Sequence, residues 1–564
     1  MKSKLLLRVM GLVLALAIMF SLLVPAFAQT DDNDYPVISV CGFGHVPLWD
    51  ESTGAQVFAP PTDKIVTAVL KVVPALTKYL VDSDANALLD TLIPEVKALF
   101  DPIKCDENGD SINPNVKVSR FFEDSADTYD YCIRENEQDQ MTLAVADVIG
   151  GENTYIFTYD WRLSMIEVAQ KLNAYIQNVK AQTGKDKVNI DGQSMGTCVV
   201  QAYLALYGTS DVKSVVMVSG AFTGLEYVGE MFRGHVQIDA DGLYNIISEA
   251  MEGSAEKDSS LTKILKYSGL FEQVLEKLAP VIQDGEYKTR LYNELVLPYF
   301  ALFPGMWAFV PSDQFDEAVQ YMFMNPDFNQ VASMEYYTKI AAYHNLVQLG
   351  MQNRCENLFN SDDVNFYIVA NYNRQVAPIT PAHKWNGDTV IESIHTSAYC
   401  KIANRGETLG DGYVQANDDG HDHISRDNVC DASTGWLPEA TWIIKNLEHV
   451  KFTQYGNGPL YAWLLTSNEQ YTVWTDEEYP QFMYYNVDLD YLAPYVKDIG
   501  DVDRDGDVDL IDARMALRDM TFEEALDSQS FYRADYITID AMVSQNETVG
   551  IMQMYSDEVL ANMG

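Results

Sequence analysis

A serine between two glycines most strongly constrains how this chain can fold. Gly192-Gln-Ser194-Met-Gly196 follows the apolar run Val188-Asn-Ile-Asp191 and precedes small residues, which is typical of a strand that turns sharply into a helix. A serine at such a turn has a strained backbone, and side chains two residues to either side would collide with the adjacent strand and helix. The spacing therefore predicts a tight turn that lifts the Ser194 hydroxyl clear of a sheet.

Further apolar runs have the continuous pattern of strands that are covered on both faces. They span residues 36–41, 154–159, 214–219, 366–370 and 441–444. Residues 166–180 have the apolar spacing of an amphipathic helix. Alternating strands and helices predict an α/β class fold with a mostly parallel sheet, here an α/β-hydrolase fold with its reactive groups at the carboxyl ends of the strands.

Two segments depart from this alternation. Residues from about 225 to 362 are helical and rich in aromatics, which predicts a cap inserted into the hydrolase domain; an unrelated inserted domain is the alternative. After residue 497 the composition changes to a dense acidic loop followed by short helical patterns. We therefore expect a hydrolase domain over residues 29–497 and a small helical domain over residues 498–564.

The N-terminus has the features of a secretory signal peptide over residues 1–28. Basic Lys2, Lys4 and Arg8 precede an apolar run, and Ala26-Phe-Ala28 forms a small-residue cleavage site. The alternative is an uncleaved membrane anchor. We expect a mature chain that begins near Gln29, has no transmembrane span and is secreted, either free or associated with a cell surface or a multienzyme complex.

Charge and cysteine content fit an extracellular protein. Acidic residues outnumber basic ones by 82 to 38, for a net charge of -44, which argues against nucleic acid and against anionic lipid surfaces as electrostatic partners. Export permits disulfides, and we expect the pairs Cys105–Cys132 and Cys400–Cys430. Cys41 and Cys198 lie in segments expected to be buried, as small hydrophobic side chains.

A serine nucleophile needs a base and an acid, which follow it in the order acid, then histidine, in this fold. Asp411, between two glycines in Gly410-Asp-Gly-Tyr-Val414, is the predicted acid; an ordinary turn aspartate is the alternative. His449 is the predicted base because it follows the last strand pattern, whereas His421 and His423 lie too near Asp411.

Two backbone amides are predicted to stabilise a developing oxyanion. The first is the N–H of Met195, at the start of the helix after the nucleophile. The second should come from the loop after the first strand, where Gly42 and Gly44 allow close approach, and Phe43 N–H is the candidate.

Four segments in this order resemble the lecithin:cholesterol acyltransferase family, which includes phospholipid:diacylglycerol acyltransferases and lysosomal phospholipases. They are Pro36-Val-Ile-Ser-Val-Cys-Gly42, Tyr159-Asp-Trp-Arg162 with Gly192-Gln-Ser-Met-Gly196, Gly410-Asp-Gly-Tyr-Val414, and Glu448-His-Val450. The resemblance implies Ser194, Asp411 and His449 as the triad, oxyanion donors at Phe43 and Met195, and glycerolipid or phospholipid esters as substrates. The chain departs from the family at Cys41, where proline is usual, and at Tyr413, where threonine is usual.

Asp160-Trp161-Arg162 is the most distinctive part of this resemblance. We expect an Arg–carboxylate pair that supports the site beneath a packed indole, rather than a group that contacts the substrate directly.

The segment Asp501-Val-Asp-Arg-Asp-Gly-Asp-Val-Asp-Leu-Ile-Asp512 has the spacing of a calcium-binding loop. Five side chains supply oxygens, Asp507 supplies a backbone carbonyl, and Gly506 permits the sharp turn. The five are Asp501, Asp503, Asp505, Asp509 and Asp512. The loop resembles that of a dockerin, the module that anchors cellulosomal enzymes to cohesins, which implies a structural Ca²⁺ and a cohesin-type scaffold partner. A second loop at residues 536–547 has lost its glycine, which Ala541 replaces, and is predicted to bind calcium poorly.

These features lead to three functional hypotheses. The first is a secreted serine esterase for lipid acyl esters, either a lipase or phospholipase or an O-acyltransferase, without a catalytic cofactor. The second keeps the reaction but takes ester-decorated polysaccharide as substrate. The third is an inactive binding module on a hydrolase scaffold.

Overall fold

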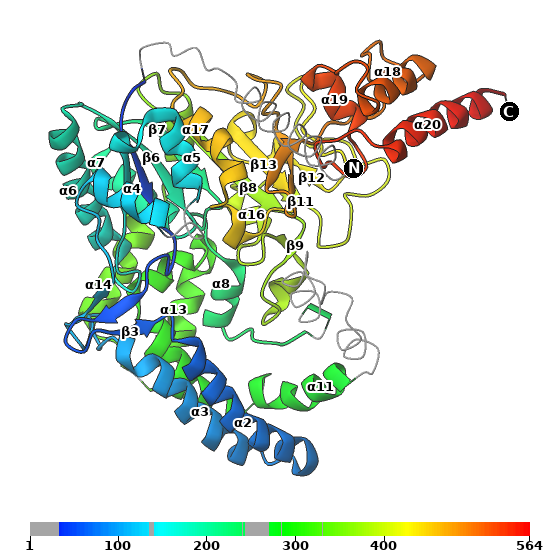
Figure 1. Ribbon diagram of the computed structural model, residues 1–564. Coiled ribbons are helices and arrows are strands. Elements are labelled where there is room, and N and C mark those ends of the chain that lie inside the picture. The colour runs from blue at the N-terminus through cyan, green and yellow to red at the C-terminus, as the bar shows by residue number, and fades with distance from the viewer. Residues whose placement is uncertain are drawn as a thin grey trace, which may run out of the picture. The chain divides into compact units, whose positions relative to one another are not determined.

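The computed structural model describes residues 33–134, 140–239, 241–242, 270–283, 285–329 and 331–563, so the predicted signal peptide lies outside the described residues. An eight-stranded sheet forms the centre of the fold (Figure 1). In spatial order its strands are β15 (Tyr491–Pro494), β14 (Phe482–Asn486), β13 (Thr441–Lys445), β8 (Asn365–Tyr372), β7 (Val212–Val218), β6 (Val188–Gln193), β1 (Val37–Val40) and β5 (Thr154–Phe157). All neighbours pair in parallel except β14 and β15. The predicted mostly parallel α/β sheet is confirmed.

Helices cover both faces of this sheet, which explains the continuous apolar strands. In β7, Val215 and Met217 pack with one layer of helices, whereas Val216 and Val218 pack with the other. The first layer contains α6 (Met165–Thr183) and α7 (Gly196–Tyr207); the second contains α5 (Gln140–Ile149) and α17 (Gly458–Leu465). The helix predicted at residues 166–180 is α6.

The segment between β7 and β8 is helical, as the sequence predicts for residues 225–362, and its described residues contain no strand. Its helices are α8 (Glu226–Phe232), α11 (Leu270–Gln283), α12 (Gly285–Leu291), the π-helical η3 (Tyr292–Ala301), α13 (Phe315–Phe323), α14 (Met334–Tyr343) and α15 (Met351–Phe359). Residues 243–269 of this segment lie outside the described residues.

A second insertion, between β1 and β5, was not anticipated. It holds a three-stranded antiparallel sheet and the helical hairpin of α2 and α3 (Figure 1). Its elements are β2 (Leu48–Asp50), β3 (Ala55–Phe58), β4 (Val116–Val118), α2 (Thr62–Asp82), α3 (Ala85–Phe100) and α4 (Ser125–Arg134). The hairpin packs against the other insertion, because Leu88 and Leu89 of α3 share a hydrophobic cluster with Leu278 and Val281 of α11. The two insertions therefore form one continuous body beside the sheet.

After β8 the chain forms short hairpins before it returns to the sheet. These elements are β9 (Arg374–Gln375), β10 (Asn386–Gly387), α16 (Ser393–Thr396), β11 (Lys401–Ile402) and β12 (Cys430–Asp431). The C-terminal segment contains α18 (Leu510–Met520), α19 (Ser528–Ala534) and α20 (Gln545–Met563), which bury a small hydrophobic cluster of their own. This segment belongs to the same compact unit as the rest of Tyr35–Gly564.

All seven cysteines are buried free thiols, so the expected disulfides Cys105–Cys132 and Cys400–Cys430 are not formed. Cys105 and Cys132 pack in two different hydrophobic clusters, which explains why the first pair does not meet. Cys400 and Cys430 share a cluster, but the Cys400 thiol donates to the Ser397 carbonyl. Across the described residues, no helix combines the length and apolar character that a membrane crossing requires.

Candidate active site

Ser194 lies at the turn between β6 and α7, in the strained conformation that its flanking glycines predict. Its φ is 51°, in the left-handed region, and its N–H donates to the Val218 carbonyl of the neighbouring strand. A Cβ at Gly196 would lie 2.1 Å from the Val40 carbonyl oxygen, and one at Gly192 would lie 3.0 Å from Val200. The glycines are therefore required by close packing of the turn on β1 and α7.

His449 lies against the nucleophile, as predicted. It begins a single 3₁₀ turn, His449–Lys451, just after β13. Its Nε2 is 2.8 Å from Ser194 Oγ, and the imidazole is almost fully buried. This is the geometry in which an imidazole accepts the proton of a serine hydroxyl.

Asp388, rather than Asp411, holds the imidazole of His449. Asp388 Oδ2 is 2.8 Å from His449 Nδ1, and the aspartate is fully buried. It follows β10, and its Oδ1 accepts the N–H groups of Val390 and Ile391. Because both of its oxygens are engaged, the carboxylate is fixed in one orientation.

The prediction of Asp411 as the acid is therefore wrong. Asp411 is exposed, on a loop that is tied to Asn428: Leu409 N–H donates to the Asn428 carbonyl, and the Asn428 amide donates to the Gly410 carbonyl. Both candidates follow a glycine in a turn, so local pattern does not separate them. The signal for Asp388 was its position, in the first turns after the β8 strand, where the acid of this fold is expected.

The other candidate histidines have structural roles. His423 is fully buried between Gln481 Oε1 at 2.7 Å and Asp419 Oδ2 at 2.9 Å, and His421 stacks on Trp474. His423 is thus a packed side chain whose ring is held by Gln481 and Asp419 rather than by Ser194.

The loop after β1 reaches Ser194, as required for an oxyanion donor. A Cβ at Gly42 would lie 2.9 Å from Ser194 Cβ, so this backbone approaches the nucleophile closely. Neither Phe43 N–H nor Met195 N–H donates a hydrogen bond within the described chain.

Asp160 and Arg162 form the buried pair that the sequence predicts. The guanidinium is fully buried and contacts both carboxylate oxygens, at 2.9 Å from Nε and 2.5 Å from Nη2. It also donates to the carbonyls of Ile103 and Val116 and to Ser111. Burial alone would lower the pKa of Arg162, but Asp160 outweighs it and raises that pKa. The pair thus ties the insertion to the end of β5.

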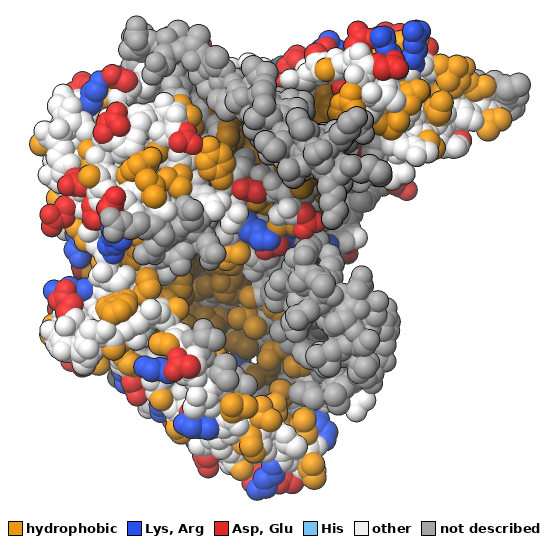
Figure 2. Space-filling view, in the orientation of Figure 1, with side chains coloured by type: hydrophobic (Ala, Val, Ile, Leu, Met, Phe, Trp, Pro, Cys, Tyr) orange, Lys and Arg blue, Asp and Glu red, His pale blue; other side chains and the backbone are white. Residues whose placement is uncertain are grey.

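Trp161 belongs to an aromatic cluster that begins next to the nucleophile. Its ring centroid lies 4.2 Å from Phe43, 4.9 Å from Phe58 and 5.5 Å from Phe303. Phe43 directly follows Gly42 and is 39% exposed. Figure 2 shows that the face between α8 and the α2–α3 hairpin is hollowed and lined mainly by hydrophobic side chains. Phe43 is therefore the exposed member of an aromatic cluster next to the loop that contacts Ser194.

Glu392 connects the loop of Asp388 to the first helix of the insertion. Its carboxylate is fully buried and accepts the N–H groups of Glu226 at 3.0 Å and Tyr227 at 3.2 Å, at the start of α8. Burial raises the pKa of Glu392 to about 7, despite the opposing effect of His395 and these hydrogen bonds. No sequence pattern indicated this contact.

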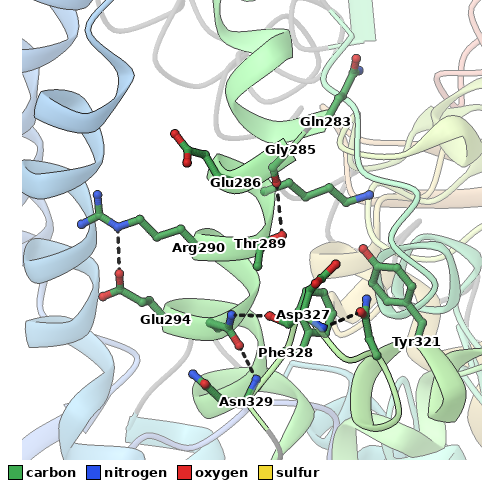
Figure 3. A pocket seen from close by; sticks show the side chains of 13 residues that line it. Gln283, Gly285, Glu286, Thr289, Arg290, Glu294, Tyr321, Asp327, Phe328 and Asn329 are labelled. Atoms are coloured by element: carbon green, nitrogen blue, oxygen red, sulfur yellow. Dashed lines mark hydrogen bonds and ion pairs between the residues drawn. The ribbon is translucent and has the colours of Figure 1, made fainter.

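A separate pocket of about 860 Å³ lies on α12, η3 and the residues after α13 (Figure 3). Most of its lining residues are polar, and Asp327 lies near the Tyr321 ring, whereas Arg290 points away toward Glu294. None of Ser194, Asp388 and His449 lines it. It is therefore distinct from the site around the nucleophile.

The predicted calcium loop gathers carboxylates in the C-terminal segment. Two groups of three carboxylates are close enough to share an ion, because the ligand atoms within each group lie within 4.8 Å of one another. Asp512 belongs to both groups. The groups are Asp501, Asp503 and Asp512, and Asp507, Asp509 and Asp512. Asp505, also a predicted ligand, belongs to neither and accepts Asp507 N–H. Gly506 has a φ of 99°, as the turn requires.

These residues fit a hard divalent cation. Asp501 Oδ1 is buried without a hydrogen-bond partner, which is a costly arrangement unless a cation neutralises it. Burial and the nearby Asp512 raise the pKa of Asp503. In the second loop, Glu547 accepts hydrogen bonds from Thr538 and Ser544, and Asp540 Oδ1 is likewise buried without a hydrogen-bond partner.

Among the comparisons with known proteins, a family model supports the fold over part of the chain. The model of the alpha/beta hydrolase fold family matches residues 138–243, which include β5, β6, β7 and the turn at Ser194. Similar solved structures include the Tle4–Tli4 complex, with 13% identity, a TM-score of 0.30, and coverage of 77% of this chain and 97% of that one. A bromoperoxidase from Bacillus anthracis has 13% identity, a TM-score of 0.22, and coverage of 58% and 85%. No curated protein matches the chain.

Proposed function

We propose that this α/β-hydrolase-fold protein is a serine esterase that transfers acyl groups through a covalent acyl-enzyme at Ser194. The hydrogen-bonded series Ser194–His449–Asp388, with both contacts at 2.8 Å, is the observation that carries the proposal. The fold itself indicates a hydrolase. Ser194, Asp388 and His449 also follow one another along the chain in the order of nucleophile, acid and histidine that this fold has, which supports the proposal.

The proposed reaction has two stages. Ser194 Oγ attacks the ester carbonyl carbon while His449 Nε2 accepts its proton, and the oxyanion is stabilised by the N–H groups of Met195 and Phe43. The carbon–oxygen bond then breaks, and the alcohol leaves with the proton from His449. Water or a second alcohol attacks the acyl-enzyme in the same way, which gives the acid or a new ester. Asp388 keeps the imidazole in the required tautomer.

Lipid acyl esters are the substrate class that we favour. Phe43, which is 39% exposed, lies beside the nucleophile at the edge of the aromatic cluster with Phe58 and Trp161, and a fatty acyl chain would gain free energy by covering it. The resemblance to the lecithin:cholesterol acyltransferase family supports the same class. Lipase or phospholipase activity and O-acyl transfer share the acyl-enzyme, so both belong to the proposal.

The C-terminal loop supports a second candidate substrate. We propose that residues 501–512 bind a structural Ca²⁺ and that the dockerin-like segment tethers a secreted enzyme to a cohesin-type scaffold. Enzymes in such an assembly act on plant polysaccharide, so a carbohydrate ester is the alternative substrate. Secretion itself rests on the signal-peptide pattern of residues 1–28.

Labelling with a fluorophosphonate probe tests the reaction. We expect a covalent adduct on the peptide that contains Ser194, located by mass spectrometry, and none in Ser194→Ala. Wild type that fails to react would support an inactive scaffold instead.

A substrate panel then tests the specificity. We expect hydrolysis of long-chain p-nitrophenyl esters and phospholipids, and ester formation when an alcohol acceptor is added. Release of acetate or ferulate from xylan, with lipid esters left intact, would favour the carbohydrate esterase.

A further inference from the structure

The short hairpin of β9 and β10 positions the acid of the proposed triad. The two strands pair antiparallel, with Arg374 opposite Gly387, and Asp388 follows directly. The Asn373 N–H donates to the Asn386 side chain at 2.6 Å, which braces the base of this hairpin. The position of Asp388 therefore depends on the segment that contains Arg374.

Arg374 also contacts the loop that carries the base. Its Nε donates to the Asn446 carbonyl at 2.9 Å, and its Nη2 lies 3.7 Å from Glu448 Oε1. Both Arg374 and Glu448 are buried. The side chains of Asn373 and Asn446 are hydrogen bonded at 2.6 Å beside this contact. One guanidinium thus links the hairpin of Asp388 to the turn of His449.

Glu448 directly precedes His449, so its carboxylate is a second negative charge on the loop that carries the imidazole. Asp388 is hydrogen bonded to the ring, whereas Glu448 faces Arg374, with Lys451 at 3.7 Å and Tyr485 as its other titratable neighbours. A buried carboxylate without its cation would favour the imidazolium form of His449. A buried guanidinium without its anion would disfavour it.

We infer that Arg374 and Glu448 are positioning residues of the proposed esterase. Arg374 holds the loops of Asp388 and His449 in register, and its positive charge offsets the negative charge of Glu448, the residue before His449. This inference rests on the proposed function, since it concerns the same imidazole.

The pH dependence of kcat/KM tests it, with a p-nitrophenyl ester as substrate and the rate of fluorophosphonate labelling as a second readout. In Arg374→Met we expect the acid limb of the pH profile to move to higher pH, and in Glu448→Gln to lower pH, by about one pH unit each. The double variant should return the limb close to that of wild type. Arg374→Lys should keep the limb but lower kcat, because an ammonium cannot make both contacts in the same geometry.

If the acid limbs of the active variants move in the same direction, or do not move, the inference is overturned. The proposed esterase function would still stand in that case. If Arg374→Met fails to fold, the limbs of Glu448→Gln and Arg374→Lys decide the question. Wild type without activity or labelling would instead overturn the proposed function.

Discussion

Asp388 and His449 are joined by two hydrogen bonds, although 61 residues separate them. His449 Nδ1 meets Asp388 Oδ2 at 2.8 Å, and the His449 backbone N–H donates to the Asp388 carbonyl at 2.5 Å. The side-chain contact selects the tautomer of the imidazole, and the backbone contact fixes the distance between the two loops. Together they orient Nε2 toward Ser194.

Replacing Asp388 should therefore impair the reaction far more than replacing Asp411. We expect Asp388→Asn to lower kcat by about 10³- to 10⁴-fold, because the amide favours the wrong tautomer of His449. Asp411→Asn, the matched change at an exposed aspartate, should leave kcat within about twofold of wild type, as expected for a surface position. Steady-state kinetics of both variants decide which aspartate is the acid. Equal losses of kcat in the two variants would contradict the assignment of Asp388.

Gly196→Ala should prevent the nucleophile turn from forming. The added methyl would lie 2.1 Å from the Val40 carbonyl oxygen, so β1 and α7 would have to separate. We expect a loss of folding free energy of more than about 3 kcal/mol, as for severe overpacking. Gly350→Ala is the control, since its nearest contact is 3.9 Å away. Denaturant unfolding measures both, and similar midpoints would show that the turn tolerates a side chain.

The C-terminal loop should bind one calcium ion per chain. At a free calcium concentration of 100 times Kd, binding would stabilise the folded state by about 2.7 kcal/mol. Isothermal titration calorimetry should give one site in wild type, none after Asp512→Asn, and one after Asp540→Asn in the second loop. Two sites in wild type, or a site that survives Asp512→Asn, would contradict this reading of the two loops.

Glu392 should make stability fall as pH rises. The folded-state pKa is raised to about 7 from an ordinary value of 4.5, so the folded protein binds more protons than the unfolded chain between these values. The free energy of unfolding is therefore highest below pH 4.5 with respect to this group and decreases toward pH 7. The change is at most about 3 kcal/mol, since one pKa unit corresponds to about 1.4 kcal/mol.

The variant Glu392→Gln isolates this effect. We expect it to be less stable than wild type at pH 4.5, because the amide cannot accept both N–H groups of α8, and the difference should shrink as pH rises to 8. Denaturant unfolding at several pH values measures it. A difference that is constant across this range would show that Glu392 does not titrate as described.

Local requirements were enough to predict the sheet, α6 and the nucleophile turn. A strained turn flanked by glycines, a doubly covered strand and an amphipathic helix each impose conditions within a few neighbouring residues, so the sequence carries them directly. The predicted base, His449, could be selected because it follows the last strand pattern. The calcium-binding loop could also be predicted from local sequence, because its predicted ligand oxygens lie within twelve consecutive residues.

Three features could be learned only from the tertiary structure. Asp388 rather than Asp411 contacts His449, the expected disulfides are not formed, and α2 and α3 form a helical hairpin. Both aspartates follow a glycine, and it is Asp388, directly after the β9–β10 hairpin, that contacts His449. Contacts of this kind join residues far apart in the chain, and their energy depends on how whole elements pack together. A pattern read along the chain contains no record of that packing. The sequence therefore determined the turn at Ser194, whereas the folded structure determined which aspartate contacts His449.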